Sequence, residues 1–181
     1  IRAHWALSEL KLSCKTKIIR TRTPDTETAA FKSVNPRQKI PVLQDGTLTM
    51  GESAAIVTYL AESYSTEQVN LIPDNPKARA KYFEWMSFIC MELDATSLYV
   101  LRRHWSLPEI YGDSPIANKA SEEYFNRMIT AADKLKNPKQ KYLLETGFSG
   151  VDILMTTTLK WAIDYNQKIP IHFMEYLDQM G

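Results

Sequence analysis

The sequence predicts a chain of two parts, an α/β unit followed by an all-helical unit. Two short strand-like runs with a turn signal between them lie within residues 35–53, whereas no strand pattern is evident after residue 75. The stretch 65–75 is polar and has the composition of a loop. We therefore place the first unit at residues 1–64, a linker at 65–75 and the second unit at 76–181.

The composition limits the classes of partner to consider. The 181 residues are 44% hydrophobic, enough for one or two compact domains. With 22 basic and 21 acidic residues, the chain has no net charge that would favour nucleic acid or an anionic membrane. No apolar run approaches the roughly 20 residues of a membrane span, and no secretory signal pattern is present. We expect no nucleic-acid partner, no membrane partner and a cytoplasmic location.

The two cysteines, Cys14 and Cys90, are far apart in the sequence. Their spacing indicates neither a disulfide framework nor a zinc site. We expect both to be small buried hydrophobic residues, and we expect no bound metal. A reducing, intracellular compartment fits this pattern.

The first unit begins with a helical pattern followed by less regular segments. Residues 1–12 place small and apolar side chains on one stripe, which predicts an amphipathic helix. Residues 17–20 predict a short strand, and residues 26–33 predict a short helix after a breaker at 23–25.

A hairpin and a helix complete the first unit. The runs 40–44 and 47–50 predict two strands, and the pair Asp45-Gly46 between them predicts a type I′ turn. Helical spacing of apolar residues then predicts a helix over 53–64. The N-terminus of that helix, with Glu52 and Ser53, is suited to a small anion. An ordinary capped helix without a ligand is the simpler alternative.

Local capping signals define the helices of the second unit. Asn75 as N-cap and Pro76 at the first helical position predict the start of a long helix that runs to about residue 104. Residues 115–135 predict the next helix. A capping box formed by Ser149 and Asp152 then predicts a helix that runs to about residue 165.

Residues 35–53 resemble the glutathione-binding half of the glutathione transferases. The family pattern is Asn-Pro, a basic residue, an apolar-Pro-Val-Leu run, a short turn and Glu-Ser opening a helix. The matching residues are Asn35-Pro36, Lys39, Ile40-Pro41-Val42-Leu43, Asp45-Gly46 and Glu52-Ser53. The chain departs from the pattern at Gln38, where many members have Gly. The family's helical domain carries the same capping box, so the resemblance extends over both halves.

The resemblance implies a thioredoxin-like N-terminal domain followed by an all-helical C-terminal domain, the glutathione transferase fold. A thioredoxin-like half has a strand before its first helix, and residues 1–64 contain none at that place. Because the chain starts at Ile1 within a helical pattern and ends directly after another, we expect the first strand and the extreme C-terminus to belong to a longer protein.

The resemblance also implies glutathione as the co-substrate. Ser53 and the helix N-terminus behind it suit the γ-glutamyl carboxylate, and Glu52 is an acceptor near the γ-glutamyl ammonium. A cis bond between Ile40 and Pro41 would turn the strand end toward the ligand, so that the backbone of Val42 pairs with the cysteinyl peptide.

Two further assignments are each weighed against a simpler one. Lys39, together with Gln38, is placed to meet the glycyl carboxylate; alternatively, it is a solvated loop charge. Asp94 lies in the long helix, in a part that faces the substrate cleft in the resembling family. An Asp at this place could bond the γ-glutamyl ammonium, sometimes across a dimer. Alternatively, Asp94 is a solvated helix charge. The basic residues 102–104 most simply complement the helix dipole.

The function implied is a glutathione transferase that joins the glutathione thiolate to small apolar electrophiles in detoxification, acting as a homodimer. The residue that activates the thiol is expected upstream of Ile1, so we assign none. If that residue is Cys, a glutathione-dependent thiol/disulfide reductase is the alternative. A non-catalytic scaffold with the same fold is a third possibility, and glutathione binding would distinguish it from the other two.

Overall fold

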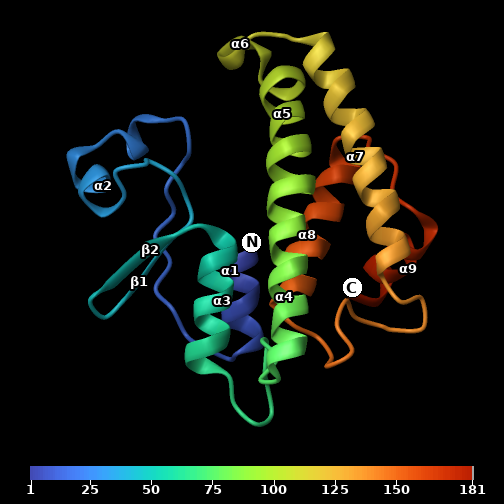
Figure 1. Cartoon of the computed structure of the whole chain (residues 1–181). Coiled ribbons are helices and arrows are strands. Elements are labelled where there is room, and N and C mark those ends of the chain that lie inside the picture. The colour runs from blue at the N-terminus through green and yellow to red at the C-terminus, as the bar shows by residue number, and fades with distance from the viewer. Residues whose placement is uncertain (181) are drawn as a thin grey trace. The chain divides into compact units, whose positions relative to one another are not determined.

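The computed structural model describes residues 1–180, which form two compact units. The first unit is Ile1–Ile72 and the second is Pro73–Gly181. The first holds two strands and several helices, and the second is helical (Figure 1). No helix within residues 1–180 is long and apolar enough to cross a membrane.

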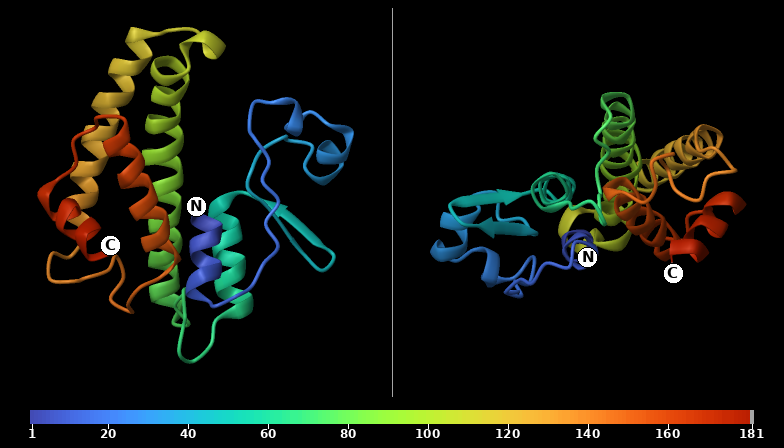
Figure 2. Two further views of the ribbon diagram at one scale, coloured as in Figure 1. Left: turned by 180° about the vertical axis from the view of Figure 1, so that it is seen from behind. Right: turned by 90° about the horizontal axis from the view of Figure 1, so that it is seen from below.

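Two helices form the core of the first unit. Its elements are α1 (Arg2–Glu9), the 3₁₀ turn η1 (Pro24–Thr26), α2 (Ala29–Val34), β1 (Val42–Asp45), β2 (Leu48–Gly51) and α3 (Ser53–Tyr64). Helices α1 and α3 lie side by side (Figures 1 and 2). The side chains buried on this unit's helices are Ala6 of α1 and Ile56, Val57, Leu60 and Ala61 of α3. The predicted helices at 1–12 and 53–64 are therefore confirmed.

The strand predicted at residues 17–20 does not form. These residues have no regular secondary structure, and Ile18 is 84% exposed. A strand needs a neighbour for its backbone hydrogen bonds, and the only sheet within residues 1–180 pairs β1 with β2 alone. The same irregular stretch leaves the Cys14 thiol exposed, so the prediction that Cys14 is buried is also wrong.

The predicted hairpin forms, with a different turn. Strands β1 and β2 are antiparallel, and Asp45 is paired with Leu48, so the two central turn residues are Gly46 and Thr47. Gly46 has φ +56°, while Thr47 keeps a negative φ. A type I′ turn requires positive φ at both central residues, whereas a type II′ turn requires it only at the first. The prediction of a type I′ turn at Asp45-Gly46 is therefore wrong by one residue and in type.

A hydrogen-bonded carboxylate joins the hairpin to α3. Asp45 Oδ2 accepts hydrogen bonds from the hydroxyl of Tyr59, at 2.8 Å, and from the hydroxyl of Tyr64. The Tyr64 and Tyr59 hydroxyls lower the pKa of the Asp45 carboxyl. In turn, the hydrogen bond to Asp45 raises the pKa of Tyr64 to about 12. This cluster fixes the end of β1 against the C-terminal half of α3.

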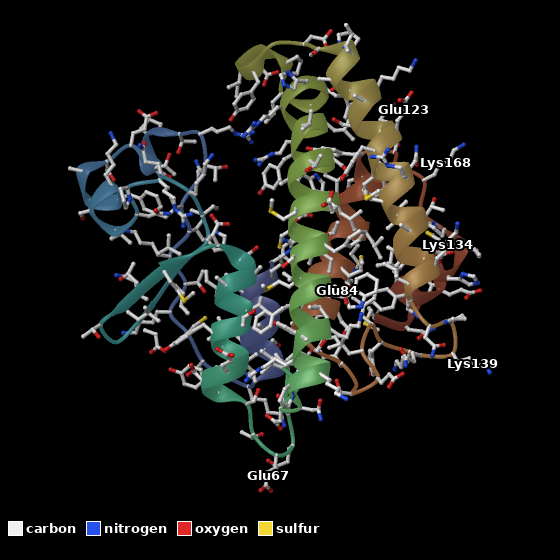
Figure 3. The ribbon with its side chains drawn as sticks, in the orientation of Figure 1. Glu67, Glu84, Glu123, Lys134, Lys139 and Lys168 are labelled. Atoms are coloured by element: carbon white, nitrogen blue, oxygen red, sulfur yellow. The ribbon has the colours of Figure 1, made fainter. Side chains whose placement is uncertain are left out.

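The second unit is built around one long helical segment. Its elements are α4 (Pro76–Phe88), the π-helical η2 (Ile89–Leu98), α5 (Tyr99–Leu101), the π-helical η3 (Arg102–Ser106), α6 (Pro108–Tyr111), α7 (Pro115–Leu135), α8 (Gly150–Asp164) and α9 (Ile171–Met180). Helices α7 and α8 pack beside the long segment (Figure 2). Charged side chains such as Glu123 and Lys134 project outward from α7 (Figure 3). The helices predicted from residue 76 to about 104 and at 115–135 are confirmed.

The middle of the long segment is wound as a π-helix. The hydroxyl of Thr96 donates to the carbonyl of Met91 at 2.7 Å, and the hydroxyl of Ser97 donates to the carbonyl of Glu92 at 2.8 Å. Both bonds span five residues, the spacing of π-helical turns. These wider turns were not predicted, because an amphipathic pattern at 3.6 residues per turn does not distinguish them from α-helix.

Asp152 links three parts of the second unit. The predicted capping box with Ser149 is present. Asp152 Oδ2 accepts from the Ser149 backbone N–H at 2.9 Å and from the Ser149 hydroxyl at 3.0 Å. Asp152 Oδ1 accepts from the Leu143 N–H and from the Tyr176 hydroxyl of α9, both at 2.9 Å. Burial raises the pKa of the Asp152 carboxyl, and these hydrogen bonds oppose the shift.

Candidate functional site

The loop before β1 is organised by one buried asparagine. Asn35 is 7% exposed, and its Nδ2 donates to the Lys39 carbonyl at 2.8 Å. Its Oδ1 accepts from the Arg37 N–H at 3.1 Å. The N–H of Gln38 donates to the Asn35 carbonyl at 2.9 Å, and Gln38 takes a positive φ of +54°. This loop leaves the side chains of Gln38 and Lys39 exposed.

The peptide bond between Ile40 and Pro41 is cis, as predicted. Val42 follows as the first residue of β1, opposite Gly51 at the end of β2. The end of β2 and the start of β1 therefore lie together at the position where α3 begins. This one end of the hairpin contains all the residues of the first unit that the sequence analysis assigned to glutathione binding, 38–42 and 52–53.

A basic residue that the sequence did not single out completes this end. Arg37 Nη1 donates to Glu52 Oε1 at 2.7 Å. Because both side chains are more than half exposed, the pair contributes only about 0–1 kcal/mol to stability. A Cβ atom on Gly51 would lie 2.8 Å from Arg37 Nη2, so glycine at this position leaves room for the guanidinium.

The N-terminus of α3 is open to a ligand. Its N-cap residue, Glu52, has φ +67° and gives no side-chain hydrogen bond to the helix. The first N–H groups of a helix have no partner within the helix, and the helix dipole adds partial positive charge there. The hydroxyl of Ser53 lies at this terminus and accepts a hydrogen bond from Arg2 Nη1 at 3.4 Å.

The charges at this end of the hairpin favour an anion. Arg2, Arg37 and Lys39 carry positive charge, and the only acidic side chain among the residues assigned here is Glu52. Within residues 1–180, no group of three or more His, Cys, Asp or Glu side chains could hold a metal ion. The arrangement is therefore suited to binding a carboxylate by charge and backbone N–H groups.

Sequence reasoning missed Arg2 and Arg37 for different reasons. Arg37 stands two residues before Lys39 in the same loop, so its position in the Asn-Pro motif could have suggested it. Arg2 is 51 residues away from Ser53 in the sequence. Only the packing of α1 against α3 brings them together, and no local pattern carries that information.

Asp94 belongs to the second unit and lies inside it. It is 4% exposed, and its Oδ1 accepts from the Thr158 hydroxyl of α8 at 2.9 Å. The alternative that Asp94 is a solvated helix charge is therefore wrong. The basic residues after it are spread around the end of the long segment: Arg102 lies over the Tyr99 ring, Arg103 lies over the Tyr111 ring, and His104 Nδ1 is 2.8 Å from the Gly112 carbonyl.

The second unit also contains an open groove of about 560 Å³. The start of α4, the end of α7 and the loop before α8 form its walls, with Trp85, Phe88 and Leu143 among the apolar lining. Glu84, which Figure 3 labels on α4, lies on its wall and pairs with Lys81 at 2.6 Å. None of the residues assigned to glutathione from the sequence lines this groove.

Known proteins resemble the chain in sequence and in structure. Residues 1–63 match the family model described as the glutathione S-transferase N-terminal domain. Glutathione S-transferase F14 from Arabidopsis thaliana is 46% identical over 63 residues, which are 34% of this chain and 25% of that protein. Glutathione S-transferase theta-1 from Rattus norvegicus is 33% identical over 84 residues, which are 46% of this chain and 35% of that protein.

A solved structure extends the similarity to both units. The theta class glutathione S-transferase from Xanthomonas axonopodis pv. citri, with glutathione bound, superposes with a TM-score of 0.81 and 23% identity, covering 99% of this chain and 85% of that chain. The chain thus has the glutathione transferase fold with a thioredoxin-like N-terminal domain, as predicted. The matched stretches span only about a quarter to a third of the two curated relatives.

Proposed function

We propose that this chain, a member of the glutathione S-transferase family, binds glutathione at the hairpin end of its first unit and acts as a transferase. The single observation that carries the proposal is the open N-terminus of α3, where the Ser53 hydroxyl and the Arg2 guanidinium converge. A carboxylate placed there would receive backbone N–H and hydroxyl donors beside a positive charge.

A γ-glutamyl carboxylate at the α3 N-terminus determines where the other groups of glutathione bind. The γ-glutamyl carboxylate binds Ser53 and the α3 N-terminus, and its ammonium group meets Glu52. The cysteinyl peptide pairs with the backbone of Val42, which the cis bond between Ile40 and Pro41 presents. Lys39 and Gln38, both exposed on the loop before β1, meet the glycyl carboxylate. Asp94 is left out of this assignment, because it is buried and bonded to Thr158.

The reaction we infer is conjugation. The glutathione thiolate attacks an electrophilic carbon of a small apolar compound, a carbon–sulfur bond forms, and the leaving group departs with its electron pair. Activation of the thiol is assigned to no residue of 1–180. We also infer a cytoplasmic homodimer with a role in detoxification, and the exposed apolar side chains Phe83 and Met91 on the long helical segment support a partner subunit.

Replacing Ser53 with Ala tests the proposal. A hydrogen bond to a charged group is worth roughly 1.5–3 kcal/mol, so glutathione affinity should fall about tenfold to a hundredfold. Turnover at saturating glutathione should fall less than the affinity. The contact is remote from the sulfur, so it stabilises bound glutathione and the transition state by nearly the same amount. Isothermal titration calorimetry gives the affinity, and circular dichroism confirms that the fold is kept.

Ser63 provides a matched control on the same helix. It lies near the C-terminal end of α3 and is exposed, so Ser63→Ala should bind glutathione as the unmodified protein does. If Ser53→Ala retains full affinity, the carboxylate site is not at the α3 N-terminus and the proposal fails. If the unmodified chain does not bind glutathione at all, the non-catalytic scaffold is the better description.

A further inference from the structure

The stretch of chain between α1 and η1, residues 11–22, is strongly basic and is here called the basic segment. It contains five of the chain's 22 basic residues and none of its 21 acidic residues. In Figure 1 it belongs to the blue stretch of chain that leads from α1 towards α2. Residues 13–20 within it have no regular secondary structure. Its five cationic side chains are all exposed, namely those of Lys11, Lys15, Lys17, Arg20 and Arg22.

The positive charge of the basic segment is not neutralised by neighbouring carboxylates. Within residues 1–180, none of its five cationic side chains forms an ion pair. The acidic residues that flank it accept hydrogen bonds from other donors. Glu9 Oε1 accepts from the Trp5 indole N–H at 2.9 Å, and Asp25 Oδ2 accepts from the backbone N–H of Arg20 at 3.3 Å. The cations of the segment are therefore available to an anionic partner.

An apolar side chain projects into solvent among these cations. Ile18 follows Lys17 directly and is 84% exposed. Cations beside an exposed apolar group suit a membrane that contains anionic lipids, where the cations meet the headgroups and the apolar group enters the boundary of the acyl chains. Nucleic acid suits the segment less well, because it is recognised beyond its phosphates by amide and aromatic side chains. The segment contains no Asn, no Gln and no aromatic residue.

We propose that the basic segment binds the surface of membranes that contain anionic lipids. Lys15 and Lys17 contact the headgroups, and Ile18 enters the boundary of the acyl chains. The expectation that the chain has no membrane partner rested on its net charge of +1, which does not describe this local excess of positive charge. The inference does not depend on the proposed glutathione site, because no residue of the segment is assigned to that site.

Vesicles of two compositions test the proposal. The full chain should sediment with vesicles of equimolar phosphatidylserine and phosphatidylcholine and much less with vesicles of phosphatidylcholine alone. Added salt should weaken this binding, because salt screens exposed charges. Each cation near an anionic surface contributes about fivefold to binding, so Lys15→Gln combined with Lys17→Gln should lower the affinity roughly 25-fold. Ile18→Ser should lower it about tenfold, through the loss of apolar burial.

A second pair of lysines provides a matched control. Lys160 and Lys168, the latter labelled in Figure 3, are exposed side chains of the second unit that form no ion pair within residues 1–180. Changing both to Gln removes the same charge and should leave vesicle binding unchanged. Glutathione affinity, measured by calorimetry, should be the same in all these variants, which separates this test from that of the proposed function.

Three results would overturn the proposal. Equal binding to the two kinds of vesicle would show that anionic lipids are not recognised. An equal loss of binding in the Lys160 and Lys168 control would show a general effect of net charge. Full vesicle affinity in Ile18→Ser, or tighter binding to a DNA duplex than to the mixed vesicles, would show attraction to phosphate charge alone.

Discussion

Replacing Asp152 with Asn should destabilise the second unit while keeping the volume of the side chain. Both carboxylate oxygens accept hydrogen bonds from buried backbone N–H groups, Oδ1 from Leu143 and Oδ2 from Ser149. An amide has one oxygen only, so in either orientation one buried N–H faces an NH₂ group and loses its acceptor. A buried donor left unsatisfied costs about 1–3 kcal/mol. Asp152→Ala removes both acceptors and should cost about twice as much.

Equilibrium unfolding in urea measures this difference. Far-UV circular dichroism and tryptophan fluorescence should both be recorded, because a chain of two units need not unfold in one step. Ser149→Ala is the control: it removes the hydroxyl and leaves both N–H acceptors in place, so it should cost only about 1 kcal/mol. The reasoning is refuted if Asp152→Asn unfolds within roughly 0.5 kcal/mol of the unmodified protein, the usual range for a surface substitution.

Three more outcomes follow from contacts of the first unit. Because the pKa of Tyr64 is raised, its hydrogen bond to Asp45 stabilises the fold fully below pH 10 and is lost as the pH rises through about 12. A spectroscopic pH titration of Tyr64→Phe should therefore lack the tyrosine ionisation near pH 12. Gly51→Ala should displace the Arg37 guanidinium without removing its charge, so glutathione affinity by calorimetry should fall while the melting temperature changes little. The exposed thiol of Cys14 should react rapidly with Ellman's reagent in the folded protein, and slow reaction would contradict its exposure.

Features encoded by a few neighbouring residues could be predicted from the sequence. Asn75 accepts from the N–H groups of Lys77 and Ala78 at the start of α4, as its place before a proline indicated. The capping box of Ser149 and Asp152 was likewise found in a short motif. In both cases the structure depends on atoms within a few residues of the signal, so sequence spacing suffices. The cis bond before Pro41 is different, because it was expected from the resemblance to the glutathione transferases.

Features that depend on distant contacts could not be predicted in this way. The segment 17–20 has strand-like residues, but strand formation depends on a neighbouring edge, which residue type does not reveal. The site residue Arg2 reaches Ser53 only through the packing of two helices. Burial of Asp94 similarly depends on a hydroxyl of α8 that is 64 residues away. The hairpin turn differs from the predicted one for a more local reason, because Gly46 can occupy a central position in either turn type.

The π-helical stretch η2 has a consequence for how this chain tolerates insertions and deletions. Each α-helical residue turns the chain by about 100°, and a π-helical turn accommodates one extra residue. Deleting one residue between Ile89 and Leu98 can convert a wide turn to an α-helical one and leave everything after it in phase, whereas deleting one residue from α4 would rotate everything after it about the helix axis by roughly that angle. The Tyr99 ring, which lies 5.0 Å from the Trp161 ring of α8, would then point away from it. The π-helical stretch can therefore absorb the loss of one residue that the α-helical part of the same segment cannot.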